Sequence, residues 1–463
     1  MPLALSPAAV DALPLLHATA VATGLLLYVA LTHSGRQRRS PASAMAWVIA
    51  LVAFPYLALP VYLLFGSRKL AHARASEDPP PSTTPAGDAP WAATLTRGLD
   101  LPPERRCAAI AIDTDGPGAL QALLALLDVA TRSIDIEMFI FRDDAVGLPV
   151  AEALARARTR GVAVRVLLDG VGAFAGRRRS LRMLREAGAT IRWFSPLRLR
   201  PQFARDNLRN HRKLVIVDDR ALWSGGRNLA REYFLDAPDA PAWHDLSIVV
   251  EGGIVIDAIA GFARDWALAG GEPAAAAPPT PAAAGGPLAQ LLPSGPDRRN
   301  DTAYDLFLGA IHRADARVLL VTPYFVPDDA LQLALVLAAR RGVQVELLLP
   351  ARSNHALADI ARQRSLRELA AAGARIHLLP RMVHAKALVI DAGFASCGSI
   401  NFDGRSLFLN YELNVLFHDA VQIEALAGWF ATRRAESSAY VARAPGWWRD
   451  VGEGLVRSVG FQL

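Results

Sequence analysis

Cysteine, lysine and charged residues in general are scarce in this chain of 463 residues. Its two cysteines, Cys107 and Cys397, exclude a disulfide framework and a cysteine-ligated zinc site. Charged residues make up 20% of the chain and hydrophobic residues 52%, which excludes a disordered chain and indicates a membrane protein. The length suits two or three domains with buried cores.

The net charge of +6 suggests at first a surface for nucleic acid. Residues 1–70 alone contribute +4, however, and the other 393 residues contain 45 basic and 43 acidic side chains. The large remainder of the chain is therefore nearly neutral, and we do not expect it to bind nucleic acid.

Two long uncharged runs lie near the N-terminus, at 13–32 and 41–67. At ~1.5 Å per residue each is long enough to cross the ~30 Å hydrocarbon layer, so we expect two membrane helices, at about 13–33 and 42–66. Two buried helices of a soluble core are the alternative. Arginines and lysines flank the second run almost equally on both sides, so charge leaves the orientation open. An even number of spans would place the N-terminus and the large remainder on one side of the membrane.

Two segments rich in proline and alanine, at 75–90 and 272–287, resemble linkers. They predict five parts: a membrane hairpin (1–70), a tether with the approach to the folded portion (71–103), a first half (104–271), a linker (272–290) and a second half with a C-terminal tail (291–463).

The two halves resemble each other. From Ala130 and from Ala314 the same order follows: an apolar strand, an Asp-Asp turn, a helix rich in alanine and leucine, Arg-Gly-Val, and a second apolar strand. Continuous apolar strands that alternate with helices are typical of an α/β domain whose sheet is covered on both faces. The sequence therefore predicts a duplicated α/β domain.

One spaced motif occurs in both halves. Each copy has a histidine, a lysine two residues later, an aspartate five residues after the lysine and an asparagine ten residues further on: His211, Lys213, Asp218 and Asn228, and His384, Lys386, Asp391 and Asn401. The chain has only three lysines against 47 arginines, and two of the three are in these motifs. A compact ammonium suits a tight pocket for a tetrahedral anion better than a planar guanidinium, which points to phosphate.

Strand geometry divides the motif residues. A histidine and a lysine two apart point to one face, whereas an aspartate seven residues from the histidine points to the other. We therefore favour a structural role for Asp218 and Asp391, paired with a basic side chain beneath the site, over a catalytic one. Asn228 and Asn401 return beside the lysines as neutral donors.

Each histidine needs a partner on its second ring nitrogen. A carboxylate opens the apolar strand that follows each motif, Asp245 in the first half and Glu412 in the second. We expect Asp245 to orient His211 and Glu412 to orient His384. Ordinary charges at the start of a strand are the alternative.

Two imidazoles, two ammonium groups and two amides together make a site for a phosphodiester. One histidine attacks phosphorus to form a phosphohistidine, while the other protonates the leaving alcohol and later deprotonates the incoming one. The lysines and asparagines hold the non-bridging oxygens. This chemistry requires no cofactor or metal, and two lysines would repel a bound zinc ion.

These features resemble the phospholipase D superfamily, and most closely its bacterial cardiolipin synthases. The resemblance rests on both motifs, the apolar N-terminus, the segment Arg-Arg-Ser-Pro-Ala-Ser-Ala-Met-Ala-Trp at 38–47 and Asn-Phe-Asp-Gly-Arg-Ser at 401–406. It implies two phospholipase D-like α/β/α sandwich domains related by a pseudo-two-fold axis, preceded by two transmembrane helices.

The resemblance also implies a function. A phosphatidyl group would pass from one phosphatidylglycerol to a hydroxyl of another, giving cardiolipin and glycerol, in a multi-pass protein of the bacterial inner membrane with its catalytic halves in the cytoplasm. His211 would be the nucleophile and His384 the acid and base. The catalytic set would be His211, Lys213, Asp218, His384, Lys386 and Asp391, with Asn228, Asn401 and Ser399 on the phosphate.

The first copy has Gly226 where the second has Ser399, so it lacks one possible hydroxyl donor. Three functions stay open at this point: the transferase, a hydrolytic phospholipase D or phosphodiesterase that uses water, and a membrane scaffold without activity. The residues also leave the donor lipid open between phosphatidylglycerol and phosphatidylethanolamine.

Overall fold

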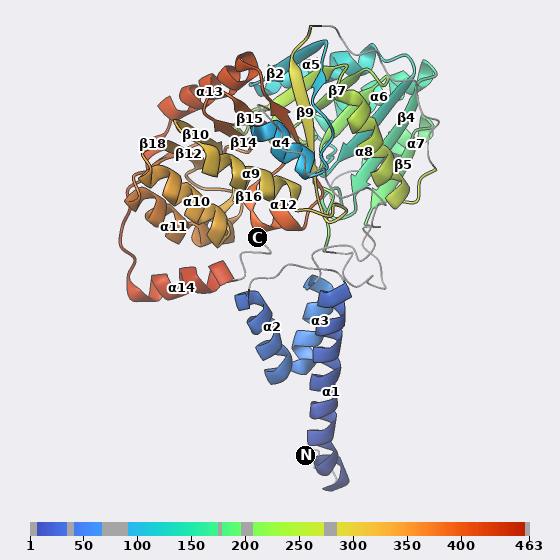
Figure 1. Ribbon diagram of the computed structural model, residues 1–463. Helices are drawn as coiled ribbons and strands as arrows, with labels where there is room; N and C mark the ends of the chain where they lie inside the picture. The colour runs from blue at the N-terminus through green and yellow to red at the C-terminus, as the bar shows by residue number, and fades with distance from the viewer. Residues whose placement is uncertain are drawn as a thin grey trace. The chain divides into compact units, whose positions relative to one another are not determined.

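The computed structural model describes residues 7–34, 41–66, 91–174, 178–195, 207–272 and 285–458 (Figure 1). The chain forms a small N-terminal helical unit and a large unit that contains both halves. The tether expected at 75–90 and most of the linker expected at 272–290 lie outside the described residues.

The N-terminal unit has three helices, α1 (Pro7–Ser34), α2 (Pro41–Ala53) and α3 (Pro55–Phe65). Helix α1 contains an apolar segment of 19 residues, Pro14–Thr32, long enough to cross a membrane. The three helices pack around Tyr62, whose ring lies 5.3 Å from Tyr28 and 5.1 Å from Trp47. Most other apolar side chains of this unit are exposed, as expected for a surface that faces lipid.

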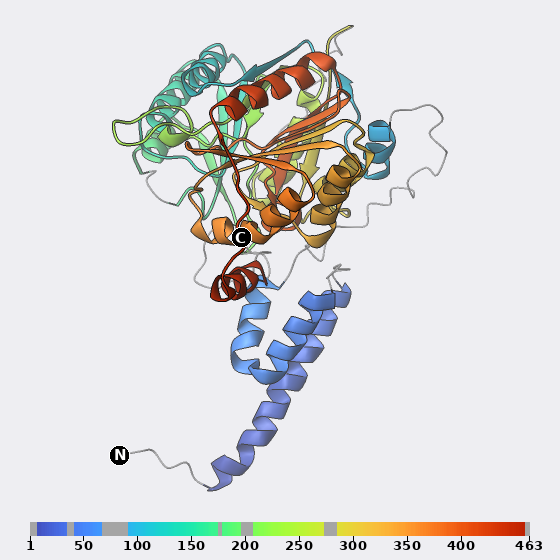
Figure 2. The same cartoon turned by 90° about the vertical axis from the view of Figure 1, so that its left-hand side faces the viewer.

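The single helix predicted at 42–66 is wrong, because the structure divides this run at Phe54. Proline at position 55 has no N–H to donate and disfavours the helical conformation of the residue before it, so Phe54 has φ −137° and ψ 56°. Helices α2 and α3 then fold back beside α1 (Figure 2). Each is too short to span a bilayer by itself.

The first half contains a seven-stranded mixed sheet. Across the sheet its strands are β2 (Ala109–Asp113), β8 (Ser247–Glu251), β7 (Ala221–Gly225), β6 (Leu214–Val217), β3 (Ser133–Met138), β4 (Ala163–Asp169) and β5 (Thr190–Phe194). Helices α5 (Gly116–Asp128), α6 (Gly147–Thr159) and α7 (Arg178–Glu186) pack against one another, and α8 (Val255–Leu268) packs on β5, β6 and β7. Strands β3, β4 and β5 are parallel, as helical crossovers require.

The second half repeats this order. Its strands are β9 (Leu288–Ser294), β17 (Glu412–Phe417), β15 (Phe394–Gly398), β14 (Ala387–Ile390), β10 (Arg317–Val321), β12 (Gln344–Pro350) and β13 (Arg375–Leu379). Its helices are α9 (Thr302–Arg313), α10 (Asp329–Arg340), α11 (Ala356–Ala371), α12 (Gly404–Phe408) and α13 (Ala420–Ala435). The predicted duplication of an α/β domain is thereby confirmed, strand by strand.

Two further segments pack onto the second half. The segment before the first sheet forms α4 (Trp91–Gly98), which packs on α9, and β1 (Arg105–Arg106), which pairs with β9. These residues therefore join the second half, although the sequence placed them in the tether and at the start of the first half. At the other end, β18 (Ser438–Ala439) pairs with β13, and α14 (Trp447–Ser458) packs on α11.

Candidate active site

The two motifs lie at equivalent points of the two sheets. His211 and Lys213 directly precede the central strand β6, and His384 and Lys386 directly precede β14. All four side chains are buried. The histidine-lysine pair of each half therefore comes from a segment that is fixed by the middle of its sheet.

Each motif segment is bound by backbone hydrogen bonds to the opposite half. The N–H of His211 donates to the carbonyl of Tyr411 at 2.9 Å, and the N–H of His384 donates to the carbonyl of His244 at 2.7 Å. Tyr411 and His244 are the residues immediately before the two carboxylates, Glu412 and Asp245. This exchange brings each carboxylate to the histidine of the other half.

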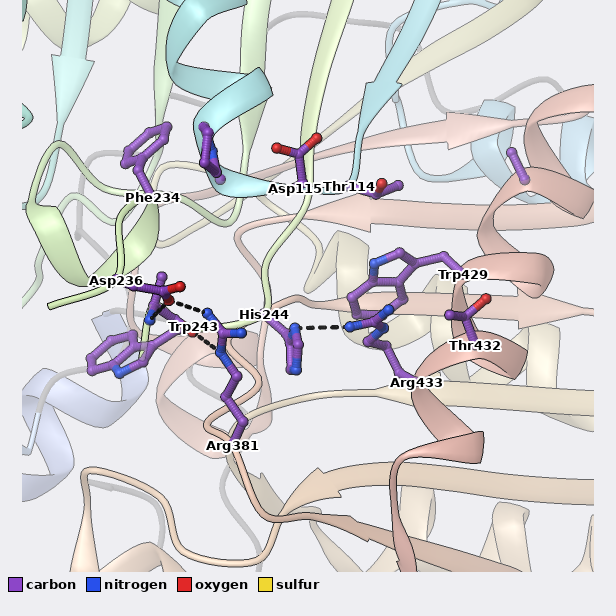
Figure 3. Close-up of a pocket in the computed structure, with 14 residues that line it drawn as sticks. Thr114, Asp115, Phe234, Asp236, Trp243, His244, Arg381, Trp429, Thr432 and Arg433 are labelled. Carbon is purple, nitrogen blue, oxygen red and sulfur yellow. Dashed lines mark hydrogen bonds and ion pairs between the residues drawn. The ribbon is translucent and has the colours of Figure 1, made fainter. Parts of the chain in front are cut away.

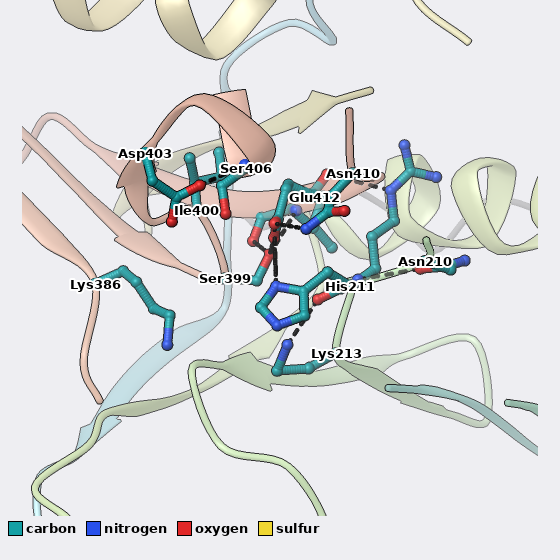
Figure 4. A network of polar contacts seen from close by, with 12 residues as sticks. Asn210, His211, Lys213, Lys386, Ser399, Ile400, Asp403, Ser406, Asn410 and Glu412 are labelled. Atoms are coloured by element: carbon teal, nitrogen blue, oxygen red, sulfur yellow. Dashed lines mark hydrogen bonds and ion pairs between the residues drawn. The ribbon is translucent and has the colours of Figure 1, made fainter. Parts of the chain in front are cut away.

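The carboxylate pairing predicted from the sequence is therefore wrong. Both oxygens of Glu412 lie 3.0 Å from Nδ1 of His211 (Figure 4). In the other pair, Oδ2 of Asp245 lies 2.8 Å from Nδ1 of His384. The two carboxylates are the expected ones, but each contacts the histidine of the opposite half. Since a carboxylate accepts the hydrogen bond, each imidazole donates from Nδ1 and keeps the lone pair on Nε2. For His384 that nitrogen lies 2.9 Å from Nζ of Lys386, which can donate to it.

Ser399 also has a different place from the one predicted. Its buried hydroxyl donates to Glu412 at 2.5 Å and accepts from the N–H of Leu413 at 2.9 Å, so it supports a carboxylate and is not free to bind phosphate. The first copy has no room for this side chain. A Cβ on Gly226 would lie 2.1 Å from Oδ1 of Asp245, which explains the glycine at this position.

Arg212, between the histidine and lysine of the first motif, connects the halves beneath the site. Its guanidinium forms an ion pair with Asp265 of α8 and donates to the carbonyls of Glu412, at 3.2 Å, and of Ser294, at 3.3 Å. It is buried, and its charge is balanced by Asp265. Arg212 thus holds the backbone of the residue that orients His211.

The ammonium groups of the two lysines lie close to the two histidines, and burial and nearby charges set their pKa values. Nζ of Lys213 donates to the carbonyl of His211 at 2.7 Å, and Nζ of Lys386 to the carbonyl of His384 at 2.5 Å. Burial is the main cause that lowers the pKa of Lys213 to about 7 and that of Lys386 to about 8, and the charge of Lys386 lowers the pKa of Lys213 further. An anion between them would relieve both effects.

Both histidines are neutral at neutral pH. Burial lowers the pKa of His211 to about 4 and that of His384 to about 3, although Glu412 and Asp245 oppose the shift. Lys386 contributes to the lowered pKa of His211, and Lys213 to that of His384. Together with the exchanged contacts of Glu412 and Asp245, they indicate that the two motifs lie close together.

The asparagines of the two copies differ in their contacts. Oδ1 of Asn228 accepts from the N–H of Ile140 at 3.1 Å, so the amide nitrogen is its remaining donor. Asn401 is buried, and among the described residues no group donates to its Oδ1. Both lie at the ends of the turns that follow β7 and β15, as their spacing predicts.

The motif aspartates lie at the other end of strands β6 and β14, away from the histidines. The carboxylate of Asp218 accepts from the N–H groups of Thr131, Arg132 and Ser133, at 2.7 to 3.2 Å. Asp391 accepts in the same way from residues 315–317. The structural role is thus supported, but the expected basic partner is wrong: each aspartate binds backbone N–H groups at the start of β3 or β10.

Aromatic residues that the sequence did not single out surround the histidines. Phe139 makes an edge contact with His211 at 4.9 Å between ring centroids, and Tyr233 makes one with His384 at 4.9 Å. Trp243 lies 5.6 Å from His384. No motif marks these positions, although Tyr233 stands five residues after Asn228, within the turn that returns to the site.

Comparisons with known proteins agree with this geometry. A family model described as "Cardiolipin synthase, PLD-like domain" matches residues 123–266 and 307–434, and one described as "Phospholipase_D-nuclease N-terminal" matches residues 21–67. Cardiolipin synthase A of Pseudomonas entomophila is 32% identical over 425 residues, 87% of this chain and 89% of that protein. The enzyme of the same name from Pseudomonas putida KT2440 is 32% identical over 415 residues, 85% of this chain and 86% of its own.

Solved structures show the same fold. Phosphatidylserine synthase from Haemophilus influenzae superposes with a TM-score of 0.63 at 14% identity, covering 80% of this chain and all of that one. With the apolar α1, these relatives identify a membrane protein that acts on phospholipids. The chain belongs to the cardiolipin synthase family of the phospholipase D superfamily and is a phospholipase D-type phosphatidyltransferase.

Proposed function

We propose that the enzyme makes cardiolipin from two molecules of phosphatidylglycerol and releases glycerol. One observation carries the proposal: His211 and His384, each held by a carboxylate of the opposite half, share a buried site with two lysines. The site has the groups needed to bind a phosphodiester anion and to exchange one alcohol for another. The similarity to cardiolipin synthases supports this choice of lipid.

In the first step, Nε2 of His211 attacks phosphorus of the donor lipid. The bond between phosphorus and the glycerol headgroup oxygen breaks, and a phosphatidyl-histidine forms. Glu412 holds the proton of His211 on Nδ1, so the attacking nitrogen carries its lone pair. Lys213 and Lys386 stabilise the charge on the non-bridging oxygens.

His384 serves as acid in this step and as base in the next. In the free site, burial and Lys386 lower its pKa to about 3, and a bound phosphate anion raises that pKa so that the ring can carry the proton needed by the leaving glycerol. Neutral again, His384 removes a proton from a hydroxyl of the second phosphatidylglycerol. That oxygen attacks phosphorus, the bond to His211 breaks, and cardiolipin forms.

The proposed substrate is a membrane phospholipid, so we propose a membrane location for the protein. We place the chain in the bacterial inner membrane, with α1 across the bilayer, the helices α2 and α3 inserted beside it, and the catalytic halves in the cytoplasm. The apolar surface of the three helices supports the insertion.

Product analysis tests the proposal. Purified full-length protein in detergent, given phosphatidylglycerol alone, should release cardiolipin and glycerol in equal amounts, and His211→Ala protein should release neither. Phosphatidic acid as the sole lipid product would show that water is the acceptor and would refute the transferase reaction.

A further inference from the structure

A cavity of about 610 Å³ lies between the halves, beside the catalytic site (Figure 3). Its walls come from the turn at 114–117, from residues 234–244 of the first half, from Arg381 and from α13. Trp243 belongs to its wall and also lies 5.6 Å from the ring of His384. The side chain of Trp243 therefore adjoins both the cavity and the proposed acid and base.

The corresponding place in the other half is filled. There Arg212 lies over the ring of Tyr411 at 5.3 Å and pairs with Asp265 of α8. The second motif has Ala385 in place of Arg212, and His244 stands where Tyr411 stands, directly before the carboxylate. A short side chain cannot fill the space that an arginine fills, and the cavity lies on this side, next to His244.

Two arginines face this cavity. Nη1 of Arg433 contacts Nδ1 of His244 at 3.3 Å and Nη2 pairs with Glu436 at 3.0 Å, while no group among the described residues accepts from its buried Nε. Arg381 pairs with Asp236 at 2.7 Å and donates to a backbone carbonyl.

The acids of these pairs neutralise the cavity only in part. The side chains of Asp236 and Glu436 are 72% and 44% exposed, so water screens them. Asp115, also in the wall, uses its carboxylate to cap α5. The local field is positive: burial, then Arg433 and Arg381, lower the pKa of His244 to about 4 and keep it neutral. Such a cavity favours an anion.

The other side chains that line the cavity suit the glycerol part of a lipid headgroup. Trp243, Trp429 and Phe234 offer apolar surface, and Thr114 and Thr432 offer hydroxyls. We propose that this cavity binds the phosphate ester of the acceptor, between Arg381 and Arg433, so that the acceptor's free hydroxyl reaches His384. This inference rests on the proposed transferase function and assigns the second of its two lipid positions.

The proposed recognition of the acceptor's phosphate can be tested with an acceptor that has no phosphate. By the proposed mechanism, full-length enzyme should also exchange the headgroup of phosphatidylglycerol with labelled glycerol through the same donor and the same histidines, and glycerol carries no phosphate. We expect Arg381→Gln and Arg433→Gln each to lower kcat/KM for cardiolipin formation about tenfold, the loss typical of one charged hydrogen bond, and to leave glycerol exchange within about twofold.

Matched variants and a third acceptor complete the design. Arg433→Lys should restore part of the loss, and Arg340→Gln, at an exposed position of α10, should change neither reaction. Glycerol 3-phosphate separates the two sources of a phosphate ester: losses with this acceptor as well support recognition of any phosphate ester, and losses only with phosphatidylglycerol support recognition of the lipid diester.

Equal losses in both reactions, or no loss in either, would overturn the assignment. A wild-type enzyme that makes phosphatidic acid and no cardiolipin would instead refute the proposed function, and this inference with it.

Discussion

Glu412 and His211 are 201 residues apart in the sequence, yet both carboxylate oxygens of Glu412 lie 3.0 Å from Nδ1 of His211. Asp245 and His384 form the reciprocal pair. Each motif histidine therefore has its carboxylate partner in the opposite half. Each half therefore needs the other half to supply the carboxylate that binds its motif histidine.

Removing the charge of either carboxylate should slow turnover. We expect Glu412→Gln and Asp245→Asn to lower kcat by about 10²-fold, because each histidine loses the group that fixes its tautomer and stabilises its charged form. The Glu346–His377 pair, at 2.8 Å, gives a matched control, since Glu346→Gln removes another buried carboxylate from a histidine. Its kcat per folded molecule should be normal. Equal effects in all three variants would mean that the loss reflects packing.

Arginine should not replace the site lysines. The ammonium groups of Lys213 and Lys386 are buried beneath the histidines, and a longer, planar guanidinium would have to move the imidazoles. We expect each Lys→Arg variant to lose about 10²-fold in kcat/KM, since it loses most of the phosphate contact. Lys69→Arg, the same change at the third lysine of the chain, is the control. Wild-type rates in Lys213→Arg protein would refute a shape-specific phosphate pocket.

The pH dependence of kcat/KM reports the free enzyme. His211, with a pKa of about 4, gains a proton below that pH and loses its nucleophilic lone pair. Lys213 and Lys386, with pKa values of about 7 and 8, lose their charge above those values. The rate should therefore fall below about pH 4 and again above pH 7 to 8, measured at a fixed detergent and lipid ratio. A profile that rises up to pH 10 would contradict cationic lysines as phosphate ligands.

The motif aspartates should affect stability and not chemistry. Asp218→Asn should destabilise the large unit by about 1–3 kcal/mol, because three backbone N–H groups lose a charged acceptor. Burial would raise the pKa of Asp218, but these donors outweigh it and lower that pKa. The stabilisation is therefore present above the pKa of the unfolded chain and is lost as pH falls through the lowered folded value.

Thermal unfolding in detergent at pH 7 checks this effect, together with kcat per folded molecule. The variant should unfold at a lower temperature and keep its turnover within about twofold. A normal Tm with strongly reduced turnover would instead place Asp218 in the chemistry.

Sequence patterns predicted the duplicated α/β fold because strand periodicity and the repeated spacing are local. They also indicated that the two histidine-lysine pairs occupy equivalent places in the two halves, although the structure puts each pair just before its strand and not within it. That Glu412 and Asp245 each contact the histidine of the opposite half could not be predicted from the sequence, since it depends on how the two sheets pack together and not on residue spacing. The aromatic contacts of Tyr233 and Trp243 are tertiary for the same reason.

Other differences had a local signal. Pro55 indicates a break within the second apolar run, although its length favoured one helix. In the sequence, Gly226 indicated only that the first copy lacks a hydroxyl donor. The folded structure shows that Asp245 occupies the space that a side chain at position 226 would need.

The most direct test of one shared site is to replace each histidine separately. If both halves form a single centre, His211→Ala and His384→Ala should each lower cardiolipin formation by about 10³-fold or more, because residues that act as a unit cannot substitute for one another. Either variant retaining about half of the wild-type rate would mean that each motif works alone, and would contradict the account.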